Sequence, residues 1–209
     1  MLKNLLYLAL LLILPQYLLA QTPCSGGMAG SYPCNGITLQ SYISAATMGA
    51  AEGQDSWGWT DPLDGKEYAI VALDNGTAFV DITNPVSPTY LGRLNTQTGS
   101  SLWRDVKVFN NHAYIVSDAN GNHGMQIFDL TRTVVSPPVS FTQDGWETWG
   151  TSGSNRGRAH NIIINEDSGY AYVSGVSPYI SGGLVIFNLN IDPKNPTLVA
   201  TYSAGGYCH

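Results

Sequence analysis

The 209-residue chain carries little charge, because only 11% of its residues are Asp, Glu, Lys or Arg. Acidic residues outnumber basic ones by 15 to 9, and no run of five or more basic residues occurs. The chain therefore lacks the electrostatic surface that nucleic-acid binding requires. It also lacks a Gly-x-Ser-x-Gly nucleophile turn, a His-Glu-x-x-His zinc motif and a phosphate-binding P-loop. Because these common hydrolase and nucleotide-binding motifs are absent, they give no support to the prediction of an enzyme.

Long apolar runs are absent except near the N-terminus, where Lys3 precedes an apolar run over residues 5–14. A proline and a glutamine interrupt this run, which is shorter than the roughly 20 residues of a membrane-spanning helix. A basic start, a short apolar run and a small residue at Ala20 are typical of a secretory signal peptide rather than a membrane anchor. We expect cleavage after Ala20, export, and no stable membrane span in the mature protein.

Cysteine is scarce, with three residues in the chain. Export makes disulfides permissible. Cys24 and Cys34 flank a Gly-rich loop, CSGGMAGSYPC, and we predict that they form a disulfide, with two free thiols as the alternative. Cys208 is then left over, either free or paired with a group outside this sequence.

Glycine and tyrosine are plentiful, at 23 and 12 residues, and proline numbers 11. Many turn formers and aromatic strand formers favour an all-β chain. Three stretches follow one plan, over 59–94, 103–141 and 159–202. Each has a polar pair, a turn, an apolar strand, a Gly-containing turn and a further strand, and two of them close with a Pro-bearing segment and a last strand. The equivalent positions recur at roughly 50 residues, which predicts a β-propeller of four-stranded blades, with a β-sandwich as the alternative.

We take Val71, Val116 and Val173 as equivalent positions in the three stretches. A second such set is Asp81, Asp129 and Asn188.

The repeats supply about three blades and the start of a fourth, whereas a propeller needs about four or more blades to close. We therefore expect the sequence to be an N-terminal fragment of a longer chain, with pairing to another chain as the alternative. Its predicted organisation is a signal peptide over 1–20, a cysteine loop and lead-in over 21–55, and a truncated propeller over 56–209.

Several long segments resemble the choice-of-anchor B family of secreted bacterial proteins, which carry LVIVD-type propeller repeats. The segments are CSGGMAGSYPC, DSWGWTDPLDGKEYAIVALDNGTAFVDITNP, SLWRDVKVFNNHAYIVSDANGNHGMQIFDLTR and AHNIIINEDSGYAYVSG. The resemblance implies an exported propeller, often tethered to the cell surface by a C-terminal sorting signal. It implies no catalytic activity. Family members carry the sequence Gly-Tyr-Thr-His-Asp at the position of the last residues of this chain. Here Cys208 replaces the Thr, and His209 follows it.

The polar pairs that open the repeats are the candidate site. They are Thr60-Asp61, Arg104-Asp105 and His160-Asn161, with His209 as the start of a fourth pair. At the mouth of a propeller channel, Asp105, His160 and His209, with Asp61 nearby, would suit a divalent metal. The alternative is a structural ring, in which Asp or Asn side chains bond backbone N–H groups and Arg104 pairs with Asp61 or Asp105.

We therefore expect a non-enzymatic binding module at the cell surface, with a protein or glycan ligand. The alternative is a metal-dependent hydrolase or lactonase-like enzyme that uses the ring of polar residues at the channel. On the long loop 131–158, Trp146 and Trp149 are predicted either to stack on a sugar or to pin the loop. We expect His112 and His123 to be exposed.

Overall fold

The computed structural model describes residues 21–133, 139–147, 149 and 157–209. The predicted signal peptide, residues 1–20, lies outside the described residues, as does part of the long loop. The chain divides into two compact units, Met1–Tyr42 and Ile43–His209, and each is described by itself. Across the described ranges, no helix has the length and apolar character needed to cross a membrane.

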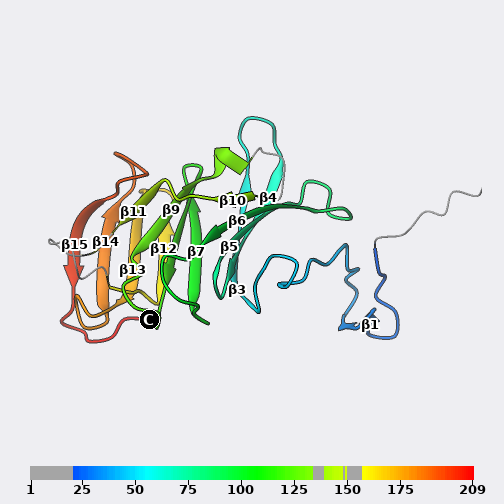
Figure 1. Ribbon diagram of the computed structural model, residues 1–209, viewed down its shortest axis with the longest axis horizontal. Helices are drawn as coiled ribbons and strands as arrows, with labels where there is room; N and C mark the ends of the chain where they lie inside the picture. Colours follow the sequence, from blue (N-terminus) through cyan, green and yellow to red (C-terminus); the bar gives the residue numbers. More distant parts are fainter. Residues whose placement is uncertain (1–20, 134–138, 148, 150–156) are drawn as a thin grey trace, which may run out of the picture. The chain divides into compact units, whose positions relative to one another are not determined.

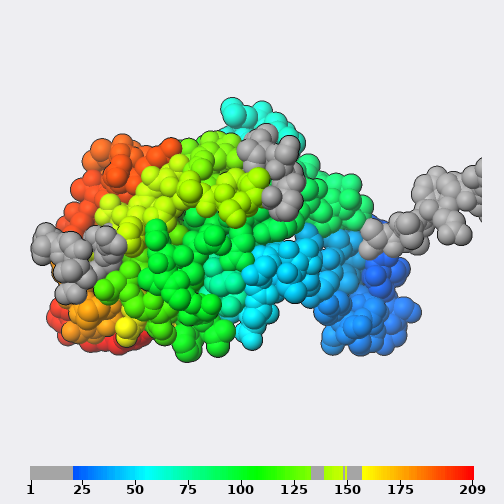
Figure 2. All heavy atoms as spheres, in the orientation of Figure 1, coloured from blue at the N-terminus to red at the C-terminus, as the bar shows by residue number. Residues whose placement is uncertain are grey.

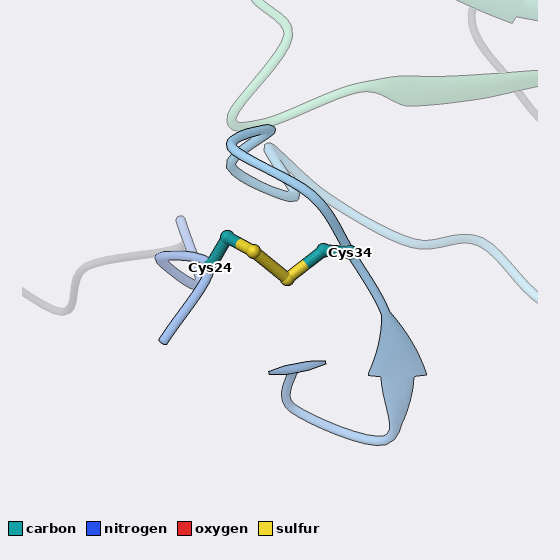
Figure 3. Close-up of a disulfide and its surroundings, with 2 residues drawn as sticks. All are labelled: Cys24 and Cys34. Carbon is teal, nitrogen blue, oxygen red and sulfur yellow. A yellow bond between two sulfur atoms is a disulfide. The ribbon is translucent and has the colours of Figure 1, made fainter. Parts of the chain in front are cut away.

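The N-terminal unit is organised around a disulfide between Cys24 and Cys34 (Figure 3). Two short antiparallel strands, β1 (Met28–Ala29) and β2 (Tyr32–Pro33), form a hairpin between the two cysteines. Gly27 has a φ of 81°, a conformation that L side chains rarely adopt. Its carbonyl accepts the Cys34 N–H at 2.9 Å, which brings the two cysteines together. The predicted disulfide is confirmed.

The C-terminal unit consists of three successive sheets, each built on four antiparallel strands (Figure 1). The first sheet contains β3 (Gly53–Thr60), β4 (Glu67–Leu73), β5 (Gly76–Asp81) and β6 (Thr89–Asn95). The second contains β7 (Arg104–Phe109), β8 (His112–Ser117), β9 (Met125–Asp129) and β11 (Gly145–Glu147). The third contains β12 (Asn161–Asn165), β13 (Tyr170–Val176), β14 (Gly183–Asn188) and β15 (Thr197–Tyr202). The all-β prediction is confirmed.

A segment between β9 and β11 links the first two sheets. A short 3₁₀ helix, Leu130–Thr133, follows β9, and β10 (Val139–Phe141) then pairs in parallel with β6 of the first sheet. The chain returns to complete the second sheet with β11. The ring of Phe141 packs edge-on against Phe79 and Phe128, at 5.5 and 5.1 Å between ring centroids, so β10 seals the core between the two sheets.

Apolar side chains from facing sheets form two cores. Between the first and second sheets, Phe79 stacks on Phe128 at 4.4 Å. Between the second and third sheets, buried residues of β8 and β9 pack against Val173 and Phe187. Strands buried on both faces need nearly continuous apolar sequence, and this explains the run AYIV in β8, every residue of which is buried.

Short turns join the strands because their residues accept unusual backbone angles. Asn110 and Asn111 form the two-residue turn between β7 and β8, with φ values of 46° and 61°. Positive φ at both positions is the type I′ turn, whose twist matches that of paired strands. The NN dipeptide thus encodes this hairpin.

The strand pairing fixes the register between repeats. Asp55 of β3, Asp105 of β7 and Asn161 of β12 hold equivalent positions, because they pair with Ala72, Val116 and Ser174 of the neighbouring strands. The first repeat therefore begins with β3, at Gly53, and not at residue 59 as the sequence pattern predicted. Val71 is equivalent to Ile115 and Val173, so the choice of Val116 was wrong by one residue. The equivalence of Asp81, Asp129 and Asn188 is confirmed by their pairing with Tyr68, His112 and Tyr170.

Candidate functional site

A pocket of about 550 Å³ lies where the first strands of the three sheets begin. Its walls come from β3, β7 and β12, and from the segment just before β7. Two apolar side chains of that segment, Leu102 and Trp103, are 54% and 52% exposed. The lining residues are Gln54, Asp55, Leu102, Trp103, Arg104, Asp105, Lys107, His160, Asn161, Ile162, Ile163, Ser174 and His209.

The structure brings five of the six predicted site residues to this pocket: Arg104, Asp105, His160, Asn161 and His209. Asp61 lies elsewhere, just beyond the other end of β3. It is six residues from Asp55, which in an extended strand is about 20 Å. Its carboxylate accepts the Leu63 N–H at 2.8 Å and so stabilises the turn DPLDG.

Asp55 holds the place in the pocket that the sequence analysis assigned to Asp61. The signal that could have found it is the pair Gln54-Asp55, which precedes SWGW as Arg104-Asp105 precedes VKVF. The strand GQDSWGWT has no apolar run, so its place as the first strand of a repeat was not visible.

Lys107 joins the two carboxylates of the pocket. Its Nζ donates to Asp55 Oδ2 at 3.2 Å and to Asp105 Oδ1 at 2.5 Å. The same ammonium group lies over the Trp57 ring, 4.6 Å from its centroid. Two acidic groups thus share one cation, and their charges are partly compensated.

The two carboxylates differ in acidity because their surroundings differ. Burial raises the pKa of Asp105, and the hydrogen bond with Asp55 raises it further, against the opposing effect of Lys107. For Asp55, burial also raises the pKa, but hydrogen bonds from Asp105 and from the Val106 and Ser56 N–H groups outweigh burial and lower it. Asp55 is therefore the carboxylate that stays ionised to lower pH.

Each of these carboxylates also accepts a backbone N–H from the next sheet. Asp55 Oδ2 accepts the Val106 N–H at 3.1 Å, and Asp105 Oδ2 accepts the Ile162 N–H at 2.9 Å. Asn161 Nδ2 donates to Asp105 Oδ2 at 3.3 Å. These contacts connect the first strands of neighbouring sheets and fix their relative positions.

Arg104 lies beneath the pocket and is only 3% exposed. Its guanidinium donates to Leu73 O at 2.8 Å and Thr96 Oγ1 at 2.9 Å, and Nη1 lies 3.0 Å from His123 Nε2. Within the described ranges it forms no ion pair, so the expected pairing with Asp61 or Asp105 was wrong. Burial lowers the pKa of Arg104 to about 10, which leaves the group charged at neutral pH.

His160 and His209 lie side by side, with 4.6 Å between ring centroids. His160 Nδ1 is 3.1 Å from Asp118 Oδ2, and the other oxygen of this carboxylate binds Arg158 Nε at 2.8 Å. Asp118 therefore helps to fix the orientation of the His160 ring, which lies tilted beside the ring of His209.

The structure places Asp105, His160 and His209 around one pocket but does not bring the three side chains together as a set of metal ligands. Among the described residues, no three His, Cys, Asp or Glu side chains form a group suited to a metal ion. Asp105 has both oxygens engaged, one by Lys107 and one by the Ile162 N–H. A metal held by Asp105, His160 and His209 stays a prediction, and its formation would require Asp105 to exchange these partners.

Two expectations about exposure were wrong. His112 and His123 are buried, at 7% and 0% exposure. His112 begins the inner strand β8, and His123 precedes β9 with its ring between Gly124 O and the Arg104 guanidinium. On the long loop, Trp149 is fully buried and packs near Phe187, and Trp146 Nε1 donates to His123 O at 2.7 Å. Both indoles pin the loop to the sheets.

Residues 65–96 match the LVIVD repeat. The match begins in the turn before β4, covers β4 and β5, and runs through β6. The first sheet is therefore built on an LVIVD repeat, as the sequence predicted. No curated protein matches the chain.

Proposed function

We propose that the chain is the N-terminal part of an exported β-propeller of the choice-of-anchor B type, which acts at the cell surface as a non-enzymatic binding module. Three successive sheets, each built on four antiparallel strands, and the LVIVD repeat at 65–96 support this architecture. The signal-like residues 1–20 support export.

The pocket at the start of the three sheets carries the binding role. Its volume of about 550 Å³ falls in the range of small-ligand sites. Trp103 offers an exposed apolar ring beside carboxylate, ammonium, amide and imidazole groups. An aromatic face next to hydrogen-bonding groups suits a sugar ring, so the favoured ligand is a glycan, with a protein side chain as the competing occupant.

Binding fits the site better than catalysis because its charged groups already have partners. Lys107 partly compensates the charges of Asp55 and Asp105, and both carboxylates also accept backbone N–H groups. Asp118 holds His160. A general base or a metal ligand needs a free lone pair, whereas groups held in this way form a rigid wall around a bound ring.

A glycan array with the exported chain tests the proposal. We expect binding to one or more surface glycans and at least a roughly tenfold loss in Trp103→Ala, since an aromatic anchor can contribute about 2 kcal/mol or more to binding. The control is Leu63→Ala, whose 87% exposed side chain lies on the turn at the other end of β3.

Equal glycan binding by both variants would place the ligand elsewhere. Capture of an envelope protein that Trp103→Ala abolishes, without any glycan binding, would favour a protein ligand. A stoichiometric metal found by elemental analysis, together with hydrolysis of a lactone or ester, would favour the metal-dependent hydrolase instead.

A further inference from the structure

One hydrogen bond recurs between neighbouring sheets. The residue at the second position of each first-strand pair accepts the N–H of the third-position residue in the next sheet: Asp55 from Val106, then Asp105 from Ile162. Asn161 holds the second position in the third sheet. The pattern therefore assigns Asn161 an acceptor role toward a sheet that follows the third.

Asn161 is prepared for this role. Its Nδ2 donates to Asp105 Oδ2 at 3.3 Å, which directs the amide oxygen away from the second sheet. Asn161 Oδ1 is buried and has no hydrogen-bond partner in the described part of the chain. A buried acceptor without a donor is unfavourable, and native proteins rarely keep one.

Apolar residues on the outer face of the third sheet are also less covered than their equivalents in the second sheet. Tyr114, Met125 and Ile127 of the second sheet are fully buried against the third sheet. Their equivalents in the third sheet are Tyr172, Leu184 and Ile186, which are only half-buried. Every residue of β15 is exposed, and the orange-to-red atoms of β14 and β15 lie at the edge of the stacked sheets in Figure 2.

A second copy of the chain is a poor occupant for this face. In a second copy, the first sheet is the one that could pack on the third sheet of this chain. The outer face of that first sheet is already covered. Ile43, Met48 and Ala50 pack there against Val71, Val80 and Tyr90. A further sheet of the same repeat has both the apolar face and the free third-position N–H that the third sheet requires.

We infer that the outer face of the third sheet is the docking surface for a fourth sheet later in the same polypeptide, and that Asn161 Oδ1 accepts the third-position N–H of its first strand. The inference rests on the propeller part of the proposed function and is independent of the ligand. The fourth sheet packs on Tyr172, Leu184 and Ile186 as the third packs on the second.

The test supplies a fourth sheet of known sequence. A duplicate of residues 161–208 is appended after His209, so that His209 takes the place of His160 and the appended copy of Ile162 becomes the third-position residue. Amide hydrogen exchange is then measured residue by residue. We expect the amide of the appended Ile162 to be protected, and Asn161→Ala to lower its protection by roughly tenfold, the effect of one hydrogen bond.

Matched variants make the result specific. Asn165→Ala, at the exposed far end of β12, is expected to leave that amide unchanged. Ile186→Lys should release the appended sheet while leaving the urea midpoint of the 209-residue chain within error, because Ile186 is half-exposed there. Asn161→Ala in the 209-residue chain should keep a cooperative urea transition, with only the small decrease in midpoint that follows from loss of the hydrogen bond to Asp105, which shows that the variant folds.

The outcomes separate the two proposals. If the appended copy shows no protected amides, no fourth sheet docks on this face, and the propeller proposal fails together with the inference. If the copy folds and docks but Asn161→Ala leaves the appended amide protected, the inference about Asn161 is refuted while the propeller proposal stands.

Discussion

Lowering the pH from 7 to 5 should destabilise the chain through His123. This ring is fully buried, and Gly124 O lies 2.9 Å from its Nδ1 while Nη1 of the buried Arg104 lies 3.0 Å from its Nε2. The same Nε2 also lies 3.1 Å from Gln126 Oε1, so Arg104, which can only donate, and Gln126 Oε1, which can only accept, compete for it. The positive charge of Arg104 favours the neutral ring. Burial, with the nearby positive charge of Arg104, lowers the pKa of His123 to about 4 from the ordinary 6.5.

The sign follows from the two pKa values. Below pH 6.5 the unfolded chain takes up a proton at His123, whereas the folded chain does not do so until about pH 4. The stability from the neutral ring is therefore complete above pH 6.5 and is lost as the pH falls toward 4. Proton linkage between pH 7 and pH 5 gives a loss of about 2 kcal/mol in the free energy of unfolding.

Urea unfolding followed by tryptophan fluorescence at pH 7, 6 and 5 measures this loss. The matched control is His123→Gln, which can donate to Gly124 O and accept from Arg104 but does not titrate. Asp105, whose raised pKa acts in the opposite direction, contributes equally to both proteins. If the variant loses as much stability between pH 7 and 5 as the parent chain, the neutral-histidine reasoning is refuted.

Three further predictions concern stability. Asp105→Ala should lower the free energy of unfolding by about 2–4 kcal/mol, because the Ile162 N–H loses its acceptor and Lys107 one of its carboxylates; Asp105→Asn, which keeps an acceptor oxygen, should cost about 1 kcal/mol in the same urea titration. Replacing Cys24 and Cys34 with serine should destabilise the N-terminal unit by about 3 kcal/mol, the value for a loop of about ten residues; hydrogen exchange should speed up in residues 21–42 and stay unchanged in the three sheets. Trp149→Ala should cost about 3–5 kcal/mol in urea unfolding, since the indole is fully buried; a change below 1 kcal/mol would contradict this packing role.

The sequence was sufficient to predict the repeated sheets. Strand-length apolar runs, turn dipeptides such as NN and the recurrence of Asp81, Asp129 and Asn188 are local signals, and the strand pairing confirms them. The disulfide could be predicted for the same reason, because only a short Gly-rich loop separates the two cysteines.

The rest depended on contacts between sheets, which no local pattern encodes. β3 escaped notice because its sequence, GQDSWGWT, is largely exposed and polar. The burial of His123 depends on Arg104, which is 19 residues away in sequence. The pairing of Asp55 with Lys107 joins residues 52 positions apart. Asp55 could therefore be placed in the site only after the sheets were aligned.

The change from Asp105 to Asn161 at the second position of the pair has a physical explanation. Lys107 stands two residues after Asp105 and forms ion pairs with both Asp105 and Asp55, whose charges it partly compensates. The corresponding residue after Asn161 is Ile163, which brings no cation to the third sheet. A carboxylate at 161 would lie about as close to Asp105 as the amide nitrogen does, at 3.3 Å, without a compensating charge. An amide avoids this repulsion and donates to Asp105. Its oxygen stays available as the acceptor that we propose for a fourth sheet, and Asn161 adds no negative charge to the pocket.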